Sequence, residues 1–285
     1  MEQLTVKGYL LEDEVGKGAG SWIYRAKRLS DRELVAIKIV VSKSRKDTPF
    51  LHQIRNEYEV ASRLEHPHLI KILGYEEEKK VFGPVKALLF MEFVEGPTLE
   101  NYKYRDIRVL LDIFIQVASA LQYMHTQDFI HSDVKPSNIL LKPGPFAKLI
   151  DFGLACRRGI QKSRVQGTID FIAPEQVGKG SIDERTDVYN FAATMYRILT
   201  GRNIPSCLSI GHDVFVSHKL RIPQVREFNR DVPQVLEDVI MRSLSPEKAD
   251  RPESIVEVHK ALAAISEKLS HRAANAESHD SQGIS

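Results

Sequence analysis

The sequence has few of the cysteines that form disulfides in small secreted domains or bind zinc. Its 285 residues include two cysteines, Cys156 and Cys207, and no Cys-x-x-Cys pair. A disulfide framework and a cysteine zinc site are therefore not expected, and both cysteines suit a reducing cytoplasm. The ten histidines show no His-Glu-x-x-His spacing, so we interpret His212 and His218 as ordinary residues rather than metal ligands.

Charge excess and long apolar runs are absent too. The 40 basic and 38 acidic side chains give a formal net charge of +2, which provides no bulk attraction to nucleic acid or membranes. No apolar run approaches the ~18 residues of a membrane span, and the acidic N-terminus lacks the apolar core of a signal peptide. We therefore expect no nucleic-acid partner, no membrane span in this chain and a cytoplasmic location.

What is present indicates a globular chain with two unlike parts. Hydrophobic residues make up 42% and charged residues 27%, as in folded domains. Strand-like runs at 9–15, 22–26, 34–41 and 85–94 surround one helical stretch at 49–64. Helical spacing follows at 108–125, 187–200, 233–244 and 253–268, with short strand-like pieces at 138–141 and 147–150. We predict an α+β chain with lobes at 1–94 and 95–268 and a disordered polar tail at 269–285.

A glycine-rich turn is the first feature with a possible chemical role. Gly16, Gly18 and Gly20 lie between two strand-like runs, and glycines let backbone N–H groups approach phosphates. The same pattern suits a flexible hairpin turn. It is not a Walker A loop, because no Gly-Lys-Ser/Thr opens a helix here.

Lys38 stands inside the apolar run 34–41. Because a buried lysine is costly without a partner, it is either an edge-strand residue facing water or a cation that holds phosphates beside a carboxylate. Glu57 on the next predicted helix is our preferred carboxylate. Glu59 is the competitor, but it points about 200° away around that helix, so both cannot face one strand.

The segment 131–138, His-Ser-Asp-Val-Lys-Pro-Ser-Asn, is more specific. It brings Asp133, Lys135 and Asn138 into one loop, which can aim a carboxylate at a hydroxyl, a cation at a phosphate and an amide oxygen at a metal. A polar turn is the alternative. Asp-Phe-Gly at 151–153 then offers Asp151 as a Mg²⁺ ligand, and Ala-Pro-Glu follows at 173–175.

In this order, the motifs resemble the signature set of eukaryotic-type Ser/Thr protein kinase catalytic domains, some bacterial ones included. The resemblance covers residues 9–262. It implies a two-lobed kinase fold, with a small antiparallel sheet and one helix in the first lobe and a mainly helical second lobe. It also implies transfer of the γ-phosphoryl group of ATP to Ser/Thr hydroxyls of protein substrates.

The resemblance implies a role for each matching residue. Asp133 would be the catalytic base, Lys135 would contact the γ-phosphate, and two Mg²⁺ ions would be held by Asn138 and Asp151. The ATP-binding positions would be Gly16, Gly18, Ser21, Ile23, Ala36, Lys38, Glu57, Met91, Glu92, Val94 and Leu140. Ile23, Ala36 and Leu140 would sandwich the adenine ring.

Further positions match residues that brace this site in the family. Thr168 resembles the threonine that bonds the catalytic Asp and Lys. Asp187 resembles the helix residue that braces the 131–138 loop, and Glu175 would pair with Arg251.

Two of the departures from the family pattern bear on the chemistry of the site. Ser21 replaces the third glycine of the turn, and we expect ATP binding to survive. Ser132 replaces the arginine that, in the family, pairs with a phosphate on the activation segment, here residues 154–166. Ser163 is the only hydroxyl in that segment, so we predict activity that is independent of its phosphorylation. The segment is basic at 157, 158, 162 and 164, which suits a solvated loop or a surface for acidic substrates or partners.

Two other functions share parts of this pattern. A pseudokinase, acting as a nucleotide-responsive scaffold, usually lacks the catalytic Asp, the metal Asp or the lysine, and all three are present here. A small-molecule kinase of related fold usually lacks the lysine after the catalytic Asp and the Ala-Pro-Glu motif. An assay of phosphoryl transfer separates these alternatives.

Overall fold

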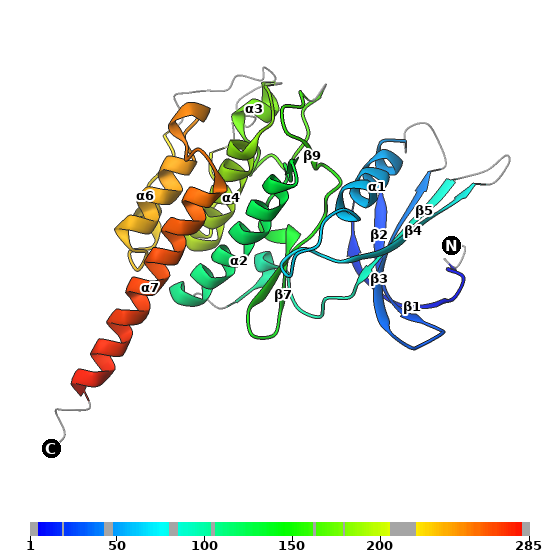
Figure 1. The fold of residues 1–285 in the computed structure, drawn as a ribbon, viewed down its shortest axis with the longest axis horizontal. Helices are drawn as coiled ribbons and strands as arrows, with labels where there is room; N and C mark the ends of the chain where they lie inside the picture. Colours follow the sequence, from blue (N-terminus) through cyan, green and yellow to red (C-terminus); the bar gives the residue numbers. More distant parts are fainter. Residues whose placement is uncertain are drawn as a thin grey trace.

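The computed structural model describes residues 5–18, 20–42, 48–79, 85–103, 106–161, 164–178, 180–205 and 221–280, without the side chains of 272–280. A β-sheet with one helix forms one lobe, and a mainly helical body forms the other (Figure 1). The predicted two-lobed α+β fold is confirmed. Cys207, His212, His218, Lys162 and Ser163, on which predictions were made, lie outside the described residues.

The first lobe is an antiparallel sheet in the order β1-β2-β3-β5-β4. Its elements are β1 Tyr9–Lys17, β2 Ser21–Arg28, β3 Leu34–Ser42, α1 Thr48–Ala61, β4 Ile72–Lys79 and β5 Val85–Glu92. Strand β4 was not predicted, because an edge strand with the glutamates of 76–78 shows no apolar pattern. Strand β3 lies at the centre of the sheet, so Lys38 is not the edge-strand residue of the alternative reading.

The second lobe contains helices and, among the described residues, the two short strand pairs β6–β9 and β7–β8. Its elements are α2 Ile107–Thr126, β6 Phe129–Ile130, β7 Ile139–Lys142, β8 Phe146–Leu149, β9 Cys156–Arg157, α3 Pro174–Val177, α4 Glu184–Thr200, α5 Val225–Phe228, α6 Gln234–Ser243 and α7 Ile255–Asp280, with 3₁₀ turns at Leu99–Asn101, Pro136–Asn138 and Lys248–Asp250. Local chemistry sets the helix ends. Asp106 caps α2 by accepting from Arg108 N at 2.8 Å, and Gly201 ends α4 at φ +70°.

Helix α2 is the centre of the second lobe. Its 20 residues are long and apolar enough to cross a membrane by length and composition alone. However, Leu111, Phe114 and Val117 are fully buried, and α2 packs against α7, α4 and β8. Burial of each such side chain stabilises the fold by about 1.5–3 kcal/mol, so the apolar character of α2 is explained by the core.

The C-terminal region differs from its prediction. We expected disorder from residue 269, but α7 continues to Asp280 and projects away from the second lobe in Figure 1. The segment 272–276 contains three alanines and no proline or glycine, and alanine is the strongest helix former. Low hydrophobicity therefore indicated the lack of a packed face here, not the lack of a helix.

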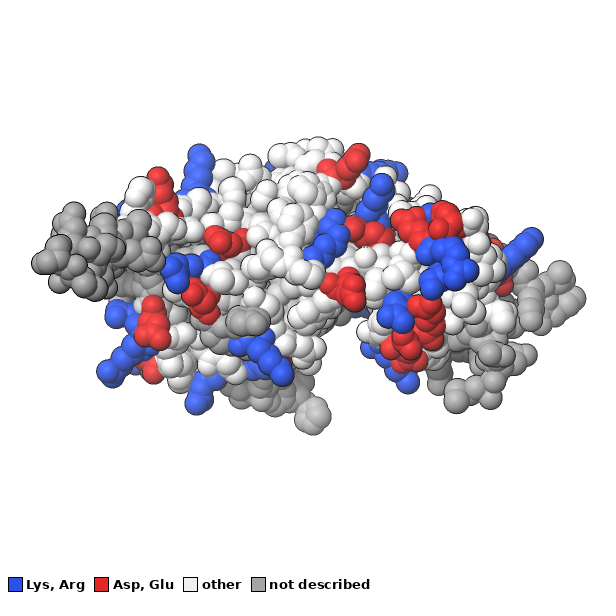
Figure 2. Space-filling view, turned by 90° about the horizontal axis from the view of Figure 1, so that it is seen from below, with Lys and Arg blue, Asp and Glu red and all other residues white. Residues whose placement is uncertain are grey.

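Charges of both signs are mixed over the surface seen in Figure 2. This face shows no extended area of one sign, as the small net charge led us to expect. A duplex nucleic acid is usually bound by a clustered basic patch or stripe, and this face offers none.

Candidate active site

A cleft of about 540 Å³ opens between the two lobes. All the positions that the sequence analysis assigned to ATP line it, and so do Lys135, Asn138 and Asp151. Asp133 lines an adjoining cavity of about 700 Å³, which shares Lys38, Lys135 and Asp151 with the first. The fold thus brings every predicted site residue to two connected cavities.

The inner part of the cleft has apolar walls. Ala36 and Met91 lie directly opposite each other on β3 and β5 and are more than nine-tenths buried, as is Val94. Sequence reasoning missed Ile70 and Ile150, which line the same cavity. The apolar residue just before Asp-Phe-Gly was the available signal for Ile150. Such a slot suits a flat, largely apolar ring.

The glycine-rich turn joins β1 to β2 above this slot. Gly18 N donates to Ser21 O at 2.8 Å and closes the turn. A Cβ atom at Gly18 would lie 2.8 Å from Ser21 Oγ, so a larger residue at position 18 would force the Ser21 hydroxyl to turn away. The loop keeps its backbone close to the cleft despite this substitution.

Lys38, Glu57 and Asp151 form one charged cluster. Lys38 Nζ lies 2.6 Å from Glu57 Oε2 and 3.3 Å from Asp151 Oδ1. Burial lowers the pKa of Lys38, but the charges of Asp151 and Glu57 outweigh it and hold that pKa above its usual value. Burial raises the pKa of Glu57 to about 7, although Lys38 opposes the rise. Glu59 is exposed, so the structure selects Glu57.

Asp151 is held by its own segment and by helix α1. Burial raises the pKa of its carboxyl, but the charges of Lys38, Lys135 and His131 outweigh this effect and lower it. Asn56 Nδ2 bonds the carbonyl oxygens of Phe152, Gly153 and Ala155 at 3.2, 3.2 and 2.9 Å. Sequence reasoning missed Asn56, whose only signal was its place beside Glu57.

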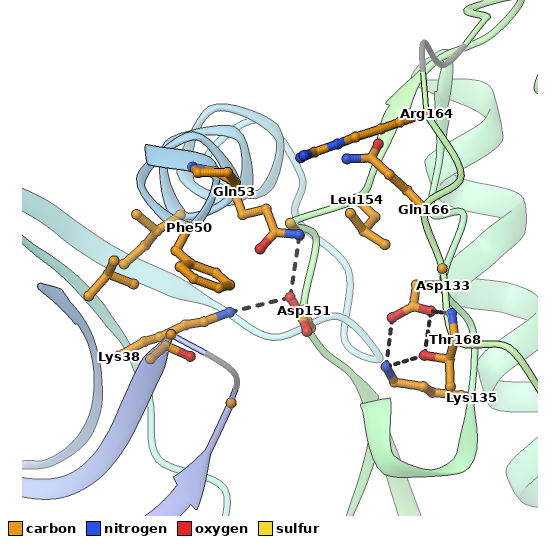
Figure 3. Close-up of a pocket in the computed structure, with 18 of the residues that line it drawn as sticks. Lys38, Phe50, Gln53, Asp133, Lys135, Asp151, Leu154, Arg164, Gln166 and Thr168 are labelled. Carbon is orange, nitrogen blue, oxygen red and sulfur yellow. Dashed lines mark hydrogen bonds and ion pairs between the residues drawn. The ribbon is translucent and has the colours of Figure 1, made fainter. Parts of the chain in front are cut away.

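The 131–138 loop surrounds the Asp133 carboxylate with donors. Lys135 Nζ lies 2.8 Å from Asp133 Oδ2 and donates to Thr168 Oγ1 at 2.6 Å. Thr168 donates to Asp133 Oδ1 through its backbone N–H and its hydroxyl, both at 3.0 Å. Figure 3 shows these three side chains together, across the cavity from Lys38. Thr168 therefore lies where the resemblance implied.

Helix α4 fixes the backbone of this loop. Asp187, fully buried, accepts from His131 N at 2.9 Å and Ser132 N at 2.8 Å, and its Oδ2 lies 2.8 Å from His125 Nε2. Burial raises the pKa of Asp187, but the hydrogen bond and charge of His125 outweigh it and lower the pKa. The bracing contact implied by the resemblance is present.

Two oxygen donors are suited to a metal ion. Asn138 Nδ2 donates to Asp133 O at 2.9 Å, which leaves Asn138 Oδ1 as the free end of the amide, and Asp151 lines the same cavity. Hard oxygen ligands of this kind suit Mg²⁺. Within the described residues no group of three or more His, Cys, Asp or Glu could hold a metal, so an ion here would take its further oxygen ligands from water or from a bound phosphate.

The activation segment is anchored by other contacts than a phosphate. Arg158 pairs with Glu184 at 2.7 Å and with Asp128 at 3.4 Å. Ser132, 1% exposed, contacts Cys156 Sγ through its hydroxyl at 3.7 Å. The short Ser132 side chain therefore lies against the beginning of the segment at Cys156.

The next anchors lie C-terminal to the segment. Gln176 Nε2 donates to Ser132 O at 2.8 Å and to Gln166 O at 3.4 Å. Arg251 holds Glu175 by two hydrogen bonds, at 2.9 and 3.0 Å, with its own side chain fully buried. The expected Glu175–Arg251 pair is thus present and fixes the end of α3.

Comparisons with known proteins point in one direction. Residues 9–263 match the family model described as the protein kinase domain. The chain is 30% identical over 250 residues to serine/threonine-protein kinase PrkC of Bacillus subtilis, covering 84% of this chain and 38% of that protein. It is also 30% identical over 255 residues to PknH of Mycobacterium tuberculosis and 28% identical over 271 residues to PknB of Mycolicibacterium smegmatis, covering 85% and 91% of this chain and 39% and 43% of those proteins. The chain therefore spans about two fifths of the length of these curated relatives.

Proposed function

Because the chain belongs to the protein kinase domain family, we propose that it transfers the γ-phosphoryl group of ATP to Ser and Thr hydroxyls of protein substrates. The observation that carries this proposal is the arrangement around Asp133, with Lys135 and Thr168 bonded to one carboxylate beside the Lys38–Asp151 pair. Phosphoryl transfer needs positioning and charge neutralisation more than covalent chemistry by the protein. Asp133 as the base and Lys38 and Lys135 as cations line one cavity, which meets that need.

In the proposed step, the substrate hydroxyl oxygen forms a bond to the γ-phosphorus while the bond from that phosphorus to the β,γ-bridging oxygen breaks. The hydroxyl proton passes to Asp133, and ADP leaves with the bonding electrons. Four hydrogen bonds reach the Asp133 carboxylate among the described residues, and Thr168, Lys135 and Asn138 donate them. Movement of Lys135 to the γ-phosphate would leave Asp133 Oδ2 with only the 3.3 Å contact from Asn138 Nδ2 and so make room for the hydroxyl.

The proposed cofactor is Mg²⁺, as in the family, with two ions held by Asn138 and Asp151. The metal would neutralise phosphate charge, and the lowered pKa of Asp151 keeps that ligand ionised. Lys38, oriented by Glu57, would hold the α- and β-phosphates. The adenine ring would lie between Ala36, Ile23 and Leu140.

We further propose that activity does not require phosphorylation of the activation segment. The support is that Arg158 and Gln176 hold the segment through Glu184 and Ser132. These contacts need no phosphate. Ser163→Ala, which removes the only hydroxyl of the segment, should change kcat/KM by less than tenfold, or about 1.4 kcal/mol. A larger loss in steady-state assays would show that a phosphate on Ser163 is needed.

The test of the main proposal is transfer of label from γ-labelled Mg-ATP to an acceptor protein, with Asp133→Asn measured alongside. Loss of a general base costs about 10²–10⁴ in rate, whereas nucleotide binding should remain. Labelled phosphoserine or phosphothreonine, strongly reduced in the variant, would support the proposal. Nucleotide binding without labelling would favour a pseudokinase scaffold, and labelling of small alcohols alone would favour a small-molecule kinase.

We propose protein substrates and ATP as the partners of this chain. We also propose a cytoplasmic location and a hinge between the two lobes near residues 94–95. Cys156 forms no disulfide among the described residues, which agrees with a reducing compartment.

A further inference from the structure

The 700 Å³ cavity that contains Asp133 has an unbalanced set of charges. Five charged side chains line it, namely Lys38, Asp133, Lys135, Asp151 and Arg164. Four of these pair with each other, Lys38 with Asp151 and Lys135 with Asp133. Arg164 is the fifth, and of the residues that the structure describes none gives it a carboxylate partner.

Among the described residues, the side chain that bonds the Arg164 guanidinium group is a neutral amide. With the Gln166 amide oriented so that its oxygen faces the guanidinium, that oxygen accepts from Arg164 Nη2 at 3.2 Å and from Nε at 3.1 Å. The other described arginines of the activation segment are paired, Arg158 with Glu184 at 2.7 Å and Arg157 with Asp128 at 3.7 Å. The basic character predicted for the whole segment is therefore reduced by these pairs, and Arg164 is the described cation that remains available.

Arg164 lines one of the two cavities and not the other. The 540 Å³ cleft beneath Met91 and Val94 does not include Arg164 among its lining residues. Arg164 lines the other cavity together with Asp133 and Thr168. In Figure 3 its side chain extends from the activation segment toward α1, on the side of the cavity away from Lys135. Arg164 thus shares a cavity with the proposed base Asp133, outside the slot proposed for the adenine ring.

We propose that Arg164 is a specificity-determining residue that binds an acidic side chain of the substrate, close in sequence to the accepting Ser or Thr. The guanidinium group presents a rigid set of donors that matches a carboxylate. Its exposure means that the pair forms without a large desolvation cost. This inference rests on the proposed kinase function and names the substrate class of the same site.

The experiment compares peptides that share one Ser acceptor and carry Glu, Gln or Lys at each of the neighbouring positions in turn. Exposed ion pairs with good geometry contribute about 1 kcal/mol or less, so the wild type should prefer Glu over Gln by about three- to fivefold in kcat/KM at one position. Arg164→Gln should bring that ratio close to one. Arg164→Glu should invert the preference toward Lys, and higher ionic strength should weaken both preferences.

Two further variants serve as controls for this experiment. Arg157→Gln removes an arginine of the same segment that is already paired with Asp128 and lies 4.1 Å over the Phe129 ring, so the Glu preference should persist. Arg164→Lys keeps the charge without the fork, and should keep part of the preference if charge recognition is the cause.

The possible failures are distinct. Equal Glu/Gln ratios in the wild type and Arg164→Gln would overturn the inference while leaving the kinase function intact. A rise in the KM for ATP without any change in peptide preference would assign Arg164 to the nucleotide instead. Absence of transfer to every peptide, with nucleotide bound, would reject the proposed function and this inference with it.

Discussion

The charges around the cleft fall into two groups that differ in burial. Lys38, Glu57 and Asp187 are held beside fixed partners with little exposed surface. The arginines of the activation segment, Arg157 and Arg158, are nearly half exposed, and their pairs reach water. A buried charge depends on its partner because no water can replace it, whereas an exposed charge can exchange partners at small cost. The buried group therefore suits fixed catalytic geometry, and the exposed group suits recognition.

The largest effect should come from Asp187→Ala, which tests the buried side of this comparison. The substitution leaves His131 N, Ser132 N and His125 Nε2 without the acceptor they share. Breaking a buried network of this kind costs about 3–5 kcal/mol, so unfolding by urea should shift strongly and kcat/KM should fall.

Asp250→Ala is the control for Asp187→Ala, since it removes an exposed carboxylate from the same lobe. Its unfolding midpoint should stay within about 0.5 kcal/mol of the wild type. Similar small shifts for both variants would mean that Asp187 does not fix the 131–138 loop.

A smaller effect is expected from pH acting on Glu57. The pKa of this carboxyl rises from 4.5 to about 7 on folding because of burial. The contribution of Glu57 to stability is therefore fully present below pH about 4.5 and is lost as pH rises through 7. Between pH 6 and 8 the wild type should lose about 1.4 kcal/mol more stability than Glu57→Gln, by urea unfolding at each pH.

The control for the pH experiment is Glu59→Gln, an exposed glutamate of the same helix. Its pH profile should follow that of the wild type. If the profile of Glu57→Gln also ran parallel to the wild type, Lys38 would hold Glu57 ionised throughout this range.

The smallest effect should come from the exposed group. A double-mutant cycle of Arg158→Ala and Glu184→Ala should give a coupling energy of about 0.5–1 kcal/mol, because the Arg158 side chain is 46% exposed. Unfolding in low and high salt measures it, and salt should reduce it. Arg242 and Glu257 form a more exposed pair on α6 and α7 and should give less. A coupling above about 2 kcal/mol for Arg158 would remove the contrast between the two groups.

Much of the fold could be predicted because its patterns are local. Helix α2 was predicted at 108–125 and spans Ile107–Thr126, since a face of buried apolar residues repeats along it. Strand β4 and the helical extension of α7 were missed for the opposite reason. Neither shows an apolar pattern, because one is an edge strand and the other projects beyond the core.

The candidate site shows the same division. Motif order predicted that Lys38, Asp133 and Asp151 would act together, and the structure brings them to adjoining cavities. Asn56, which holds the backbone after Asp151, carries no sequence signal, because a side chain that bonds carbonyl oxygens is chosen by geometry. The charge of Arg164 was visible in the sequence, but the sequence could not show that none of the described residues gives it a carboxylate partner.

By itself the sequence determined the order of the motifs, the alternation of strands and helices, and the presence of serine at position 132. Only the tertiary structure decided that Glu57 rather than Glu59 faces Lys38 and that Gln176 and Arg158 anchor the activation segment. It also decided that Arg164 has no carboxylate partner among the described residues. The physical reason is that residue type fixes what a side chain can donate, accept or bury. Which partner lies within about 3 Å of it depends on contacts between segments far apart in the chain.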